Sequence, residues 1–595
     1  MNLCIKNSAP AFLPVIRKEM EHLGWDKTDI ILVSGDAYID TPHIGISVIG
    51  RVLSDAGFRV GMISQPDVQS GRDITALGEP ALFWGVSAGC TDSMIANFTA
   101  SGKRRRNDDM TPGGQNIRRP DRALIVYANL IRQYFKNTCP IVLGGIEASL
   151  RRISHYDAWC DALRRSVLFD AKADVLVYGM GEKTVTELAE KIRRKKDIRS
   201  LRGICYIRRE IPEPSEDFPE RGIELPSHAE VCKSREAFVR MFRIFYDNTD
   251  PLTARPLYQK QDSRYLVQNP PSLPLSANEL DQIYELPYMR DVHPLDKQKG
   301  QVRALETIRF SLTTHRGCYG ECRFCAITVH QGRHVISRTR ESLLREAASF
   351  TKHPDFKGII SDAGGPTANM YGADCERKKK EGACLHKHCL FPNICKHLPA
   401  DHGKQIQLLR ELRRMPKVRK VFIASGIRYD LILADNKQGE KYLEEILRHH
   451  VSGQLKIAPE HSEDHILRHM GKPGQESLNA FMNFFAKIKG RNSQKIFLTY
   501  YLMAAHPGSA MEDMRKLREF CLGKLHLLPE QVQIFTPSPC TWSTVMYYTE
   551  RDPFTGEKLF VEKNIGKKQK QKAVMMPRHH MKKRREKKNK GSRVR

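Results

Sequence analysis

The sequence predicts an α/β protein with a doubly wound N-terminal domain, a partial (β/α)6 barrel and a basic disordered tail. Two observations predict the domains: short apolar segments with the pattern of strands alternate with segments of helical periodicity, and they do so in two separate series. The third observation is charge. Between Lys563 and Arg595, 15 lysines and arginines accompany one acidic residue, so this tail carries +14 of the net charge of +29.

Length and composition narrow the class of protein. A chain of 595 residues with 40% hydrophobic and 28% charged residues can bury several cores. A peptide hormone, a single binding module and a small disulfide scaffold are therefore excluded. No apolar run reaches the roughly 18 to 20 residues that span a bilayer, and residues 1–25 lack a signal pattern. We expect a cytoplasmic protein without membrane contact.

The first series of elements predicts a Rossmann-like domain over residues 1–204. Asp29–Ser34 has the pattern of a buried strand, and the helical periodicity that follows stops at Gly57. Further strands are expected at 59–63, 82–87, 141–143 and 175–178, with a helix at 122–135. Residues 205–304 are rich in proline and charge and show little periodicity. We expect an insertion and linker there.

The second series predicts an open barrel with a C-terminal extension over residues 305–550. Strands are expected at 307–314, 358–361, 418–424, 455–458, 496–503 and 532–535, with helices at 341–350, 440–449 and 478–488 between them. Six such repeats fall short of an eight-fold barrel. The remaining residues, 551–595, form the basic tail.

Three cysteines lie in the loop directly after the first strand of the barrel, Cys318, Cys322 and Cys325. Parallel α/β folds place their active sites at such strand ends. Gly317 and Gly320 favour a loop over a helix face that carries three small core residues. A zinc site is the other alternative, and it needs a fourth ligand such as His315 or His330.

An iron–sulfur cubane offers a different use for three thiolates, because its four irons leave one without a cysteine ligand. The CxxxCxxC spacing, with Phe324 before the last cysteine, resembles the radical S-adenosylmethionine (SAM) superfamily. The resemblance implies that Cys318, Cys322 and Cys325 hold a [4Fe-4S] cluster whose open iron binds SAM. It further implies that one electron cleaves SAM to give a 5′-deoxyadenosyl radical.

Two later segments resemble the parts of that superfamily that contact SAM. Residues 361–369 contain the pair Gly364 and Gly365, and they resemble the glycine-rich segment that receives the SAM amino group; a tight turn is the alternative. Glu460, at the end of the fourth expected strand, is the candidate for the SAM ribose or carboxylate. Ala505–Gly508 resembles the segment near adenine.

Longer segments resemble the YgiQ family of radical SAM proteins along nearly the whole chain, namely residues 35–45, 111–123, 144–157, 177–182 and 362–372. The family implies an N-terminal domain, a radical SAM core with one [4Fe-4S] cluster and a C-terminal extension, acting on an unknown substrate with an electron donor such as flavodoxin or ferredoxin.

The N-terminal domain also resembles the cobalamin-binding domains of other radical SAM enzymes. It keeps Ser87 and the pair Gly144–Gly145 at strand ends, but it lacks the DxHxxG motif that supplies a cobalt ligand. His43 lies nearby with a different spacing, and we expect it in a surface loop. Cobalamin is therefore the less favoured interpretation.

Two features leave alternatives open. A second set of cysteines accompanies three histidines and could hold zinc or a second cluster, although its spacing matches no standard zinc ribbon: Cys375, Cys384, Cys389 and Cys395, with His386, His388 and His397. The tail, with its basic run Lys582–Lys590, could contact RNA. An RNA-modifying radical SAM enzyme and a non-catalytic, metal-stabilised nucleic-acid-binding protein are thus the alternative functions.

Overall fold

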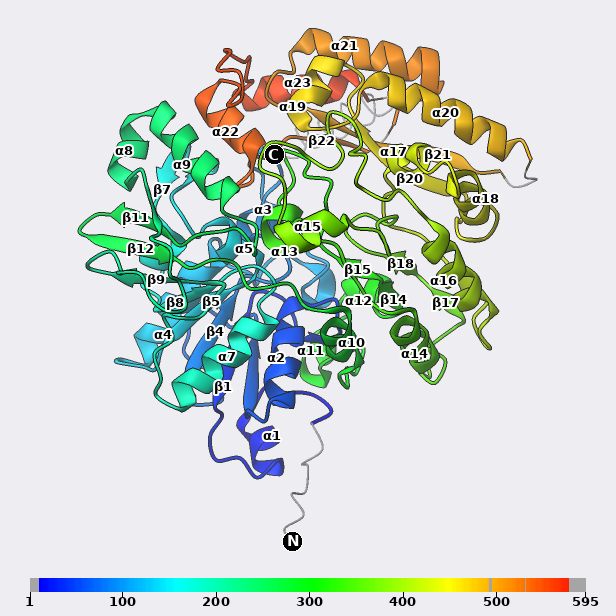
Figure 1. The fold of residues 1–595 in the computed structure, drawn as a ribbon. Helices are drawn as coiled ribbons and strands as arrows, with labels where there is room; N and C mark the ends of the chain where they lie inside the picture. Colours follow the sequence, from blue (N-terminus) through cyan, green and yellow to red (C-terminus); the bar gives the residue numbers. More distant parts are fainter. Residues whose placement is uncertain (1–9, 492–494, 530, 577–595) are drawn as a thin grey trace, which may run out of the picture.

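The first half of the protein is organised around one large mixed sheet (Figure 1). The computed structural model describes residues 10–491, 495–529 and 531–576. The sheet has nine strands in the order β10-β11-β12-β9-β8-β5-β4-β1-β3. Its strands are β1 (Ile30–Ser34), β3 (Val60–Ser64), β4 (Phe83–Ser87), β5 (Ile141–Gly144), β8 (Val175–Val177), β9 (Ile204–Arg208), β10 (Ile223–Leu225), β11 (Leu257–Gln261) and β12 (Arg264–Gln268).

Five of these strands confirm the expected doubly wound unit. β3, β1, β4, β5 and β8 are parallel and adjacent, which is the order 2-1-3-4-5 of one common doubly wound fold. Their register aligns Ser34, Ser64, Ser87 and Gly144 at the carboxyl edge of the sheet. Helices cover both faces: α4 (Ala123–Tyr134) packs on one, and α2 (Gly45–Asp55) and α7 (Glu182–Arg193) pack on the other.

Residues 205–304 differ from the expected insertion and linker. They contribute β10, β11 and β12 and most of β9 to the sheet, and β8–β9, β9–β12 and β11–β12 are antiparallel pairs. Only two residues separate β11 from β12, so part of this region is a local hairpin that the proline-rich, charged composition of the segment concealed. The segment also contains α8 (His228–Lys233), α9 (Arg235–Asp247), α10 (Ala277–Glu285), α11 (Pro294–Gln298) and β13 (Asp291–Val292), which pairs with β2 (Ile39–Asp40).

Short elements complete this half: α1 (Arg17–His22), α3 (Ser93–Asn97), α5 (Gly145–Leu150), β6 (His155–Asp157), β7 (Ala162–Arg164), α6 (Val167–Asp170) and α12 (Ala304–Ile308). The last of these takes the first two residues of the strand expected at 307–314. That strand is therefore shorter and begins at Ser311.

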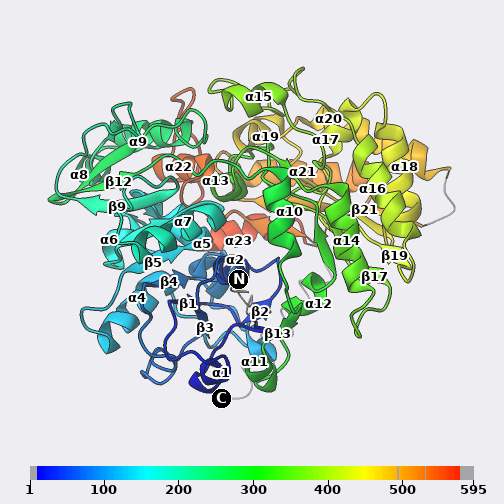
Figure 2. The same cartoon turned by 60° about the horizontal axis from the view of Figure 1, so that its bottom comes forward.

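The second half is an open arc of parallel strands with helices on its outside, as expected (Figures 1 and 2). Backbone hydrogen bonds join the strands in chain order, from 311–314 to 359–364, then to 420–424, 427, 454–460, 497–504 and 532–534. The strands are β14 (Ser311–Thr313), β17 (Ile359–Ile360), β18 (Asp362–Gly364), β19 (Lys420–Val421), β20 (Gln454–Glu460), β21 (Phe497–Ala504) and β22 (Val532–Ile534).

The helices of the arc include those predicted at 341–350, 440–449 and 478–488. They are α13 (Ile327–Gln331), α14 (Arg340–Phe350), α15 (Glu376–Glu381), α16 (Gly403–Arg414), α17 (Tyr429–Ala434), α18 (Gly439–His449), α19 (Asp464–Met470), α20 (Gln475–Lys489) and α21 (Met511–Phe520). A small antiparallel pair, β15 (His315–Arg316) and β16 (Ile336–Ser337), flanks the cysteine loop. The arc encloses its own hydrophobic cluster around Leu312, Ile360, Ile457 and Phe481.

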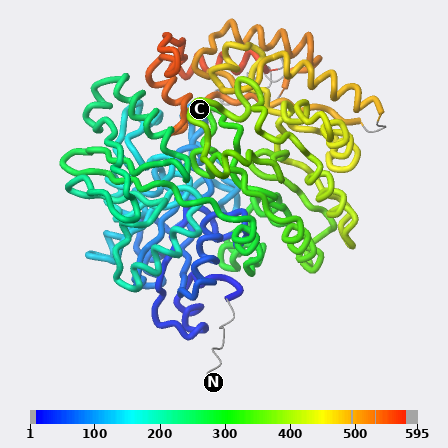
Figure 3. The backbone as a smooth tube through the Cα atoms, viewed as in Figure 1, coloured from blue at the N-terminus to red at the C-terminus, as the bar shows by residue number. Residues whose placement is uncertain are grey.

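The C-terminal part of the chain returns to the first half (Figure 3). α22 (Trp542–Thr549) lies against α9, and Trp542 packs edge-on against Phe242. α23 (Ile565–Val574) packs on β21 and β22, and Met575 behind it is fully buried. The part of the expected tail up to residue 576 is therefore folded against the barrel. The basic run Lys582–Lys590 lies outside the described residues.

No helix in the described part of the chain is long and apolar enough to cross a membrane.

Candidate active site

The cysteine loop is a closed excursion between two paired strands. It leaves β15 at Gly317, carries the three cysteines, continues into α13 and returns at β16. Cys318 N–H donates to the carbonyl of Gly332 at 3.2 Å, and Cys325 N–H donates to the carbonyl of Cys322 at 2.9 Å. Gly317 has φ +81°, and a Cβ there would lie 1.8 Å from the carbonyl oxygen of His334. Only glycine fits at the entrance to this loop.

The three thiols lie close enough to influence one another. Burial, followed by the charge of Cys322, raises the pKa of Cys318, and the same two causes raise the pKa of Cys325 to about 12. Among the described residues, however, no three cysteine sulfurs lie within 4.8 Å of one another. Zinc, with bonds to sulfur of about 2.3 Å, draws tetrahedral ligands to roughly 3.8 Å of each other. Three thiols alone also leave zinc one ligand short, whereas in a cubane each thiolate binds a different iron and one iron can stay open.

The two histidines considered as a fourth zinc ligand point elsewhere. His330 Nδ1 lies 2.9 Å from Ser149 Oγ in the N-terminal half. His315 Nδ1 lies 2.9 Å from Thr314 Oγ1, and its ring faces Gly365. The donor set of the loop is therefore three thiols without a histidine, which fits a [4Fe-4S] cluster with one open iron.

Gly364 and Gly365 lie beside this loop, as their place at the second strand end suggested. Gly364 pairs with Thr313, and its carbonyl accepts a hydrogen bond of 2.7 Å from the N–H of Thr314. A Cβ on Gly365 would lie 2.6 Å from the ring of His315, so the backbone can come this close only without a side chain. Two residues on, Thr367 Oγ1 lies 3.6 Å from the Cys318 sulfur.

Glu460 also reaches the loop, through Lys472. Glu460 ends β20 with φ +72°, and Lys472 Nζ lies 3.8 Å from its Oε1. The ammonium group donates a 2.7 Å hydrogen bond to the carbonyl of Ala458 and lies 5.9 Å from the ring centroid of Phe324. Burial raises the pKa of Glu460, and Lys472 acts in the opposite direction. The carboxylate is thus linked to the cysteine loop through the ammonium group of Lys472.

The segment expected near adenine also lies beside Phe324. The His506 ring stands edge-on to the Phe324 ring at 6.4 Å, and its Nε2 lies 2.8 Å from Ser543 Oγ. The N–H of Ser543 in turn donates to the carbonyl of Arg323 at 2.9 Å. The fifth strand end therefore reaches the cysteine loop as well.

Sequence reasoning did not identify Arg428, although this residue contacts the loop directly. Its Nη1 lies 3.6 Å from the Cys322 sulfur, and Asp430 accepts hydrogen bonds of 2.8 and 2.6 Å from the same guanidinium. Asn369 Oδ1 accepts from the backbone N–H of Arg428 at 2.8 Å, which ties it to the glycine-rich segment. Arg428 follows the strand expected at 418–424, and its position beyond a strand end was the signal available for finding it.

In the N-terminal domain, the carboxyl edge of the sheet is covered by the chain itself. Arg119 pairs with Asp36 at the end of β1 and lies 3.0 Å from Asp108. The N–H of Ala37 donates to the carbonyl of Met110, and Gln65 Nε2 donates to Thr111 Oγ1 at 2.7 Å. Doubly wound folds bind ligands in the crevice at this edge. Buried ion pairs of the protein occupy it here, and such an edge does not fit a bound cobalamin.

His43, expected in a surface loop, is instead partly buried. Both ring nitrogens are buried and have no hydrogen-bond partner, and burial lowers the pKa of His43 to about 4. The charges that act on it next are those of Arg290 and Glu346, which pair with each other. Glu346 belongs to the barrel helix α14, and an interaction of this kind between the two halves is invisible in the local sequence.

A cavity of about 110 Å³ lies between the two halves, behind the cysteine loop. Tyr178 and Met180 line it from the end of β8, and Val329 and His330 line it from α13. Neither the glycine pair nor Glu460 reaches it. It is therefore a separate space from the one bounded by the strand ends of the barrel.

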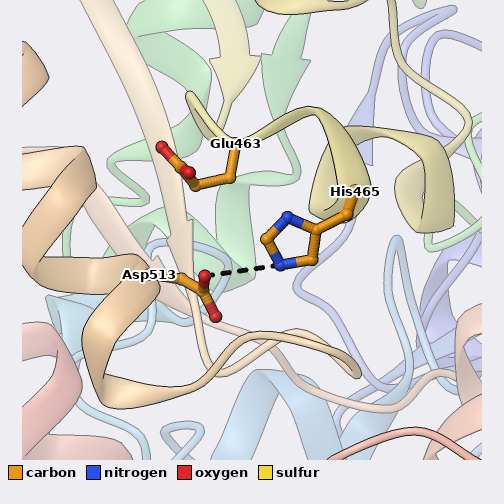
Figure 4. Close-up of side chains that lie close together, drawn as sticks. All are labelled: Glu463, His465 and Asp513. Carbon is orange, nitrogen blue, oxygen red and sulfur yellow. Dashed lines mark ion pairs between the residues drawn. The ribbon is translucent and has the colours of Figure 1, made fainter.

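One group in the described part of the chain does bring three metal-type side chains within 4.8 Å, namely Glu463, His465 and Asp513 (Figure 4). His465 Nε2 lies 3.3 Å from Asp513 Oδ1 and is half-exposed. Lys516 approaches Glu463 at 3.9 Å, and Asp513 caps the N–H of Ala510. The charges of this group are balanced by protein partners.

Comparisons with family models and with known relatives agree on one family for this chain. A model described as Radical SAM N-terminal matches residues 12–311, the Radical SAM superfamily model matches 312–521, and a domain of unknown function matches 530–585. A UPF0313 protein of Fusobacterium nucleatum is 54% identical, over 95% of this chain and 98% of its own length. A UPF0313 protein of Thermotoga neapolitana is 48% identical over 93% and 96%. The chain belongs to the UPF0313 family.

This is the YgiQ family that the sequence resembled, so that prediction is confirmed. The UPF0313 protein is a radical SAM enzyme, and its cofactors are a [4Fe-4S] cluster and SAM. The two alternative functions, RNA modification and non-catalytic nucleic-acid binding, are not favoured by the matches.

Solved structures similar to the UPF0313 chain include two radical SAM enzymes. The methyltransferase TsrM from Kitasatospora setae, with cobalamin and a [4Fe-4S] cluster, has a TM-score of 0.47 and 14% identity, covering 87% of this chain and 73% of its own. The cobalamin-dependent enzyme OxsB has a TM-score of 0.49 and 12% identity, covering 90% of this chain and 58% of its own.

Proposed function

We propose that the strand ends of the barrel form one SAM-cleaving site, in which Cys318, Cys322 and Cys325 hold the cluster. The observation that supports this most directly is convergence. Thr367 after β18, Arg428 after β19, Lys472 beside β20 and His506 after β21 each contact a residue of the cysteine loop. When bound and reduced, a [4Fe-4S] cluster supplies one electron to the sulfonium of SAM.

The side chains around the loop have distinct roles in this proposal. Gly364 and Gly365 leave the backbone open for the amino group of SAM. Glu460 binds the ribose or the amino-acid end, and Lys472 orients the Glu460 carboxylate through their 3.8 Å ion pair. Arg428 and Lys472 place positive charge beside the thiolates, which offsets the negative charge that three cysteinates bring into a partly buried loop.

The electron must come from another molecule, and we propose a small reductant protein such as flavodoxin or ferredoxin. Radical chemistry at an iron–sulfur cluster also suits a reducing compartment. The cysteines in the described ranges are free, with no disulfide among them, as expected for a cytoplasmic protein. We infer a cytoplasmic location.

The proposal is tested by anaerobic reconstitution with iron and sulfide, followed by reduction in the presence of SAM. We expect 5′-deoxyadenosine from the wild-type protein and none from Cys318→Ala, Cys322→Ala or Cys325→Ala. Cys232→Ala, at an exposed cysteine on α8, is the matched control and should retain full activity and iron content. Product formation by a variant that lacks all three loop cysteines would refute the assignment.

A second arm tests the SAM-binding role of Glu460. Glu460→Gln should weaken SAM binding about tenfold, or about 1.4 kcal/mol, without changing the iron content. Glu476→Gln, at an exposed position on α20, should change neither. If Glu460→Gln loses iron but binds SAM normally, Glu460 belongs to the support of the cluster loop. The substrate is found by comparing metabolites between cells with and without the protein.

A further inference from the structure

Four cysteines outside the proposed SAM site lie in one segment that has almost no regular structure. Cys375 precedes α15, and Cys384, Cys389 and Cys395 follow it. Between Gly382 and His402 the chain forms neither helix nor strand. Within these residues, backbone hydrogen bonds join Cys395 to Cys389 and Leu398 to Cys395. Loops of this length in a compact domain are functional or need another source of order.

Three of the sulfurs lie in one hydrophobic cluster. Cys375 is buried at 8% exposure, and Cys389 and Cys395 pack against the same group of side chains, which includes Leu390 and Leu398. Cys389 and Cys395 are half-buried, so the three cysteines gather in one partly enclosed region.

Cys384 lies at the exposed edge of the segment. The residue before it is anchored, because Ala383 N–H donates to Asp250 Oδ2 at 2.9 Å. The same carboxylate lies 2.8 Å from the ring nitrogen Nε2 of His334, and the N–H of the next residue, Val335, donates to Asp374 Oδ2 at 3.0 Å. The residues before Cys384 and before Cys375 are therefore anchored to two neighbouring residues of the chain, which holds Cys384 in the same part of the structure as Cys375.

The segment packs directly on the proposed SAM-cluster loop. Tyr319 and Cys318 belong to the same hydrophobic cluster as the second set of cysteines. His388 Nδ1 lies 3.2 Å from Glu321 Oε2, and the guanidinium of Arg323 lies 5.2 Å from the ring centroid of Phe391. Because His388 is engaged by Glu321, it does not offer its Nδ1 to a metal held by the cysteines.

The separation of the cysteines along the chain favours a cluster over zinc. Eight, four and five residues lie between successive members of the set Cys375, Cys384, Cys389 and Cys395. Structural zinc sites typically separate paired cysteines by two to four residues, and only the Cys384–Cys389 spacing falls in that range. Four thiolates are the full ligand set of a [4Fe-4S] cluster.

We propose that Cys375, Cys384, Cys389 and Cys395 bind a second [4Fe-4S] cluster. With a cysteine on every iron, this cluster has no open site for SAM. It ties the irregular segment together and holds it over Tyr319 and Glu321 of the first loop. The assignment is independent of the residues proposed to bind SAM.

Metal analysis after anaerobic reconstitution tests the second site. The wild-type protein should contain about eight irons and eight sulfides per chain, and the Cys318→Ala/Cys322→Ala/Cys325→Ala variant should keep about half of each. Cys375→Ser/Cys389→Ser/Cys395→Ser should also lose about half, while the exposed control Cys160→Ser/Cys232→Ser keeps all. About four irons in the wild-type protein, or zinc in place of iron in the first variant, would overturn the proposal.

A spectroscopic measurement on the wild-type protein covers the case in which a variant does not fold. The reduced protein should give the electron paramagnetic resonance of two clusters, and addition of SAM should change the signal of only one. A single signal that SAM converts completely would contradict a second cluster. Failure of SAM cleavage with both signals present would instead count against the proposed function alone.

Discussion

The guanidinium of Arg428 lies 3.6 Å from the sulfur of Cys322 and is held there by two hydrogen bonds to Asp430. Both side chains of this ion pair are buried. A permanent positive charge so close to a thiolate favours the more negative, reduced form of a cluster bound there. The pair therefore links the third strand end of the barrel to the electronic properties of the cysteine loop.

Arg428→Met should lower the reduction potential of the SAM-binding cluster. We expect a shift of about 60 mV or more, which is a tenfold change for one electron. The apoprotein should also lose about 3 to 5 kcal/mol, because Asp430 is left buried and unpaired. Potentiometric titration and urea unfolding measure the two effects.

The double variant Arg428→Met/Asp430→Leu separates the effect on the reduction potential from the effect on stability. This double variant should recover part of the stability, since the unpaired carboxylate is gone, yet it should keep the lowered potential. An unchanged potential in both variants would show that Arg428 acts only on folding.

Gly365→Ala should impair SAM cleavage, because the new methyl group would lie 2.6 Å from the ring of His315. Displacing the ring or the backbone costs about 1 to 3 kcal/mol. Gly45→Ala is the control, since a Cβ there meets nothing within 4 Å. Thermal unfolding and the yield of 5′-deoxyadenosine are the measurements, and normal values for both in Gly365→Ala would contradict the close approach.

The stability of the apoprotein should depend on His43 below neutral pH. Burial lowers the pKa of His43 to about 4 in the folded state, against about 6.5 in the unfolded chain. The unfolded chain therefore binds the proton first, and stability that is complete above pH 6.5 is lost as the pH falls towards 4. At pH 5 the loss is about 1 to 2 kcal/mol.

His43→Leu should remove this contribution, so its unfolding free energy should fall less between pH 7 and pH 5 than that of the wild-type protein. His22→Leu, at an exposed histidine, should keep the wild-type dependence. Equal slopes for His43→Leu and the wild-type protein in urea unfolding would mean that His43 is not enclosed in solution.

The helix α23 and the residues after it should contribute to stability despite their basic composition. Met575 is fully buried against the barrel, and Lys568 Nζ donates to the hydroxyl of Tyr547 at 2.7 Å. Met575→Ala should cost about 2 to 5 kcal/mol, as for other buried methionines. Lys567→Ala, one residue from Lys568 but exposed, should leave the unfolding midpoint unchanged. Equal midpoints for the two variants would refute docking of this segment.

Local patterns in the sequence were enough to locate the parallel strands and the chemistry of the first loop. The strand expected at Asp29–Ser34 and the helix expected at 440–449 agree closely with β1 and α18. A strand buried on both faces is a short continuous apolar run, and a helix buried on one face repeats its apolar residues every three to four positions. Cysteine spacing and a place after the first barrel strand predicted the donor set for the same reason. Each of these depends on residues close together in the chain.

Only the tertiary structure decided which distant residues meet. The antiparallel pairing of β9 with β12 carries the segment 205–304 into the sheet, and the basic segment that contains α23 ends on the buried Met575. Arg428 is 106 residues from Cys322, and Glu346, whose charge acts on His43, is about three hundred residues away from it in the chain. The sequence by itself thus determined the elements and the thiol donors. Packing determined the charges beside them, because a contact between distant segments depends on the path of the whole chain.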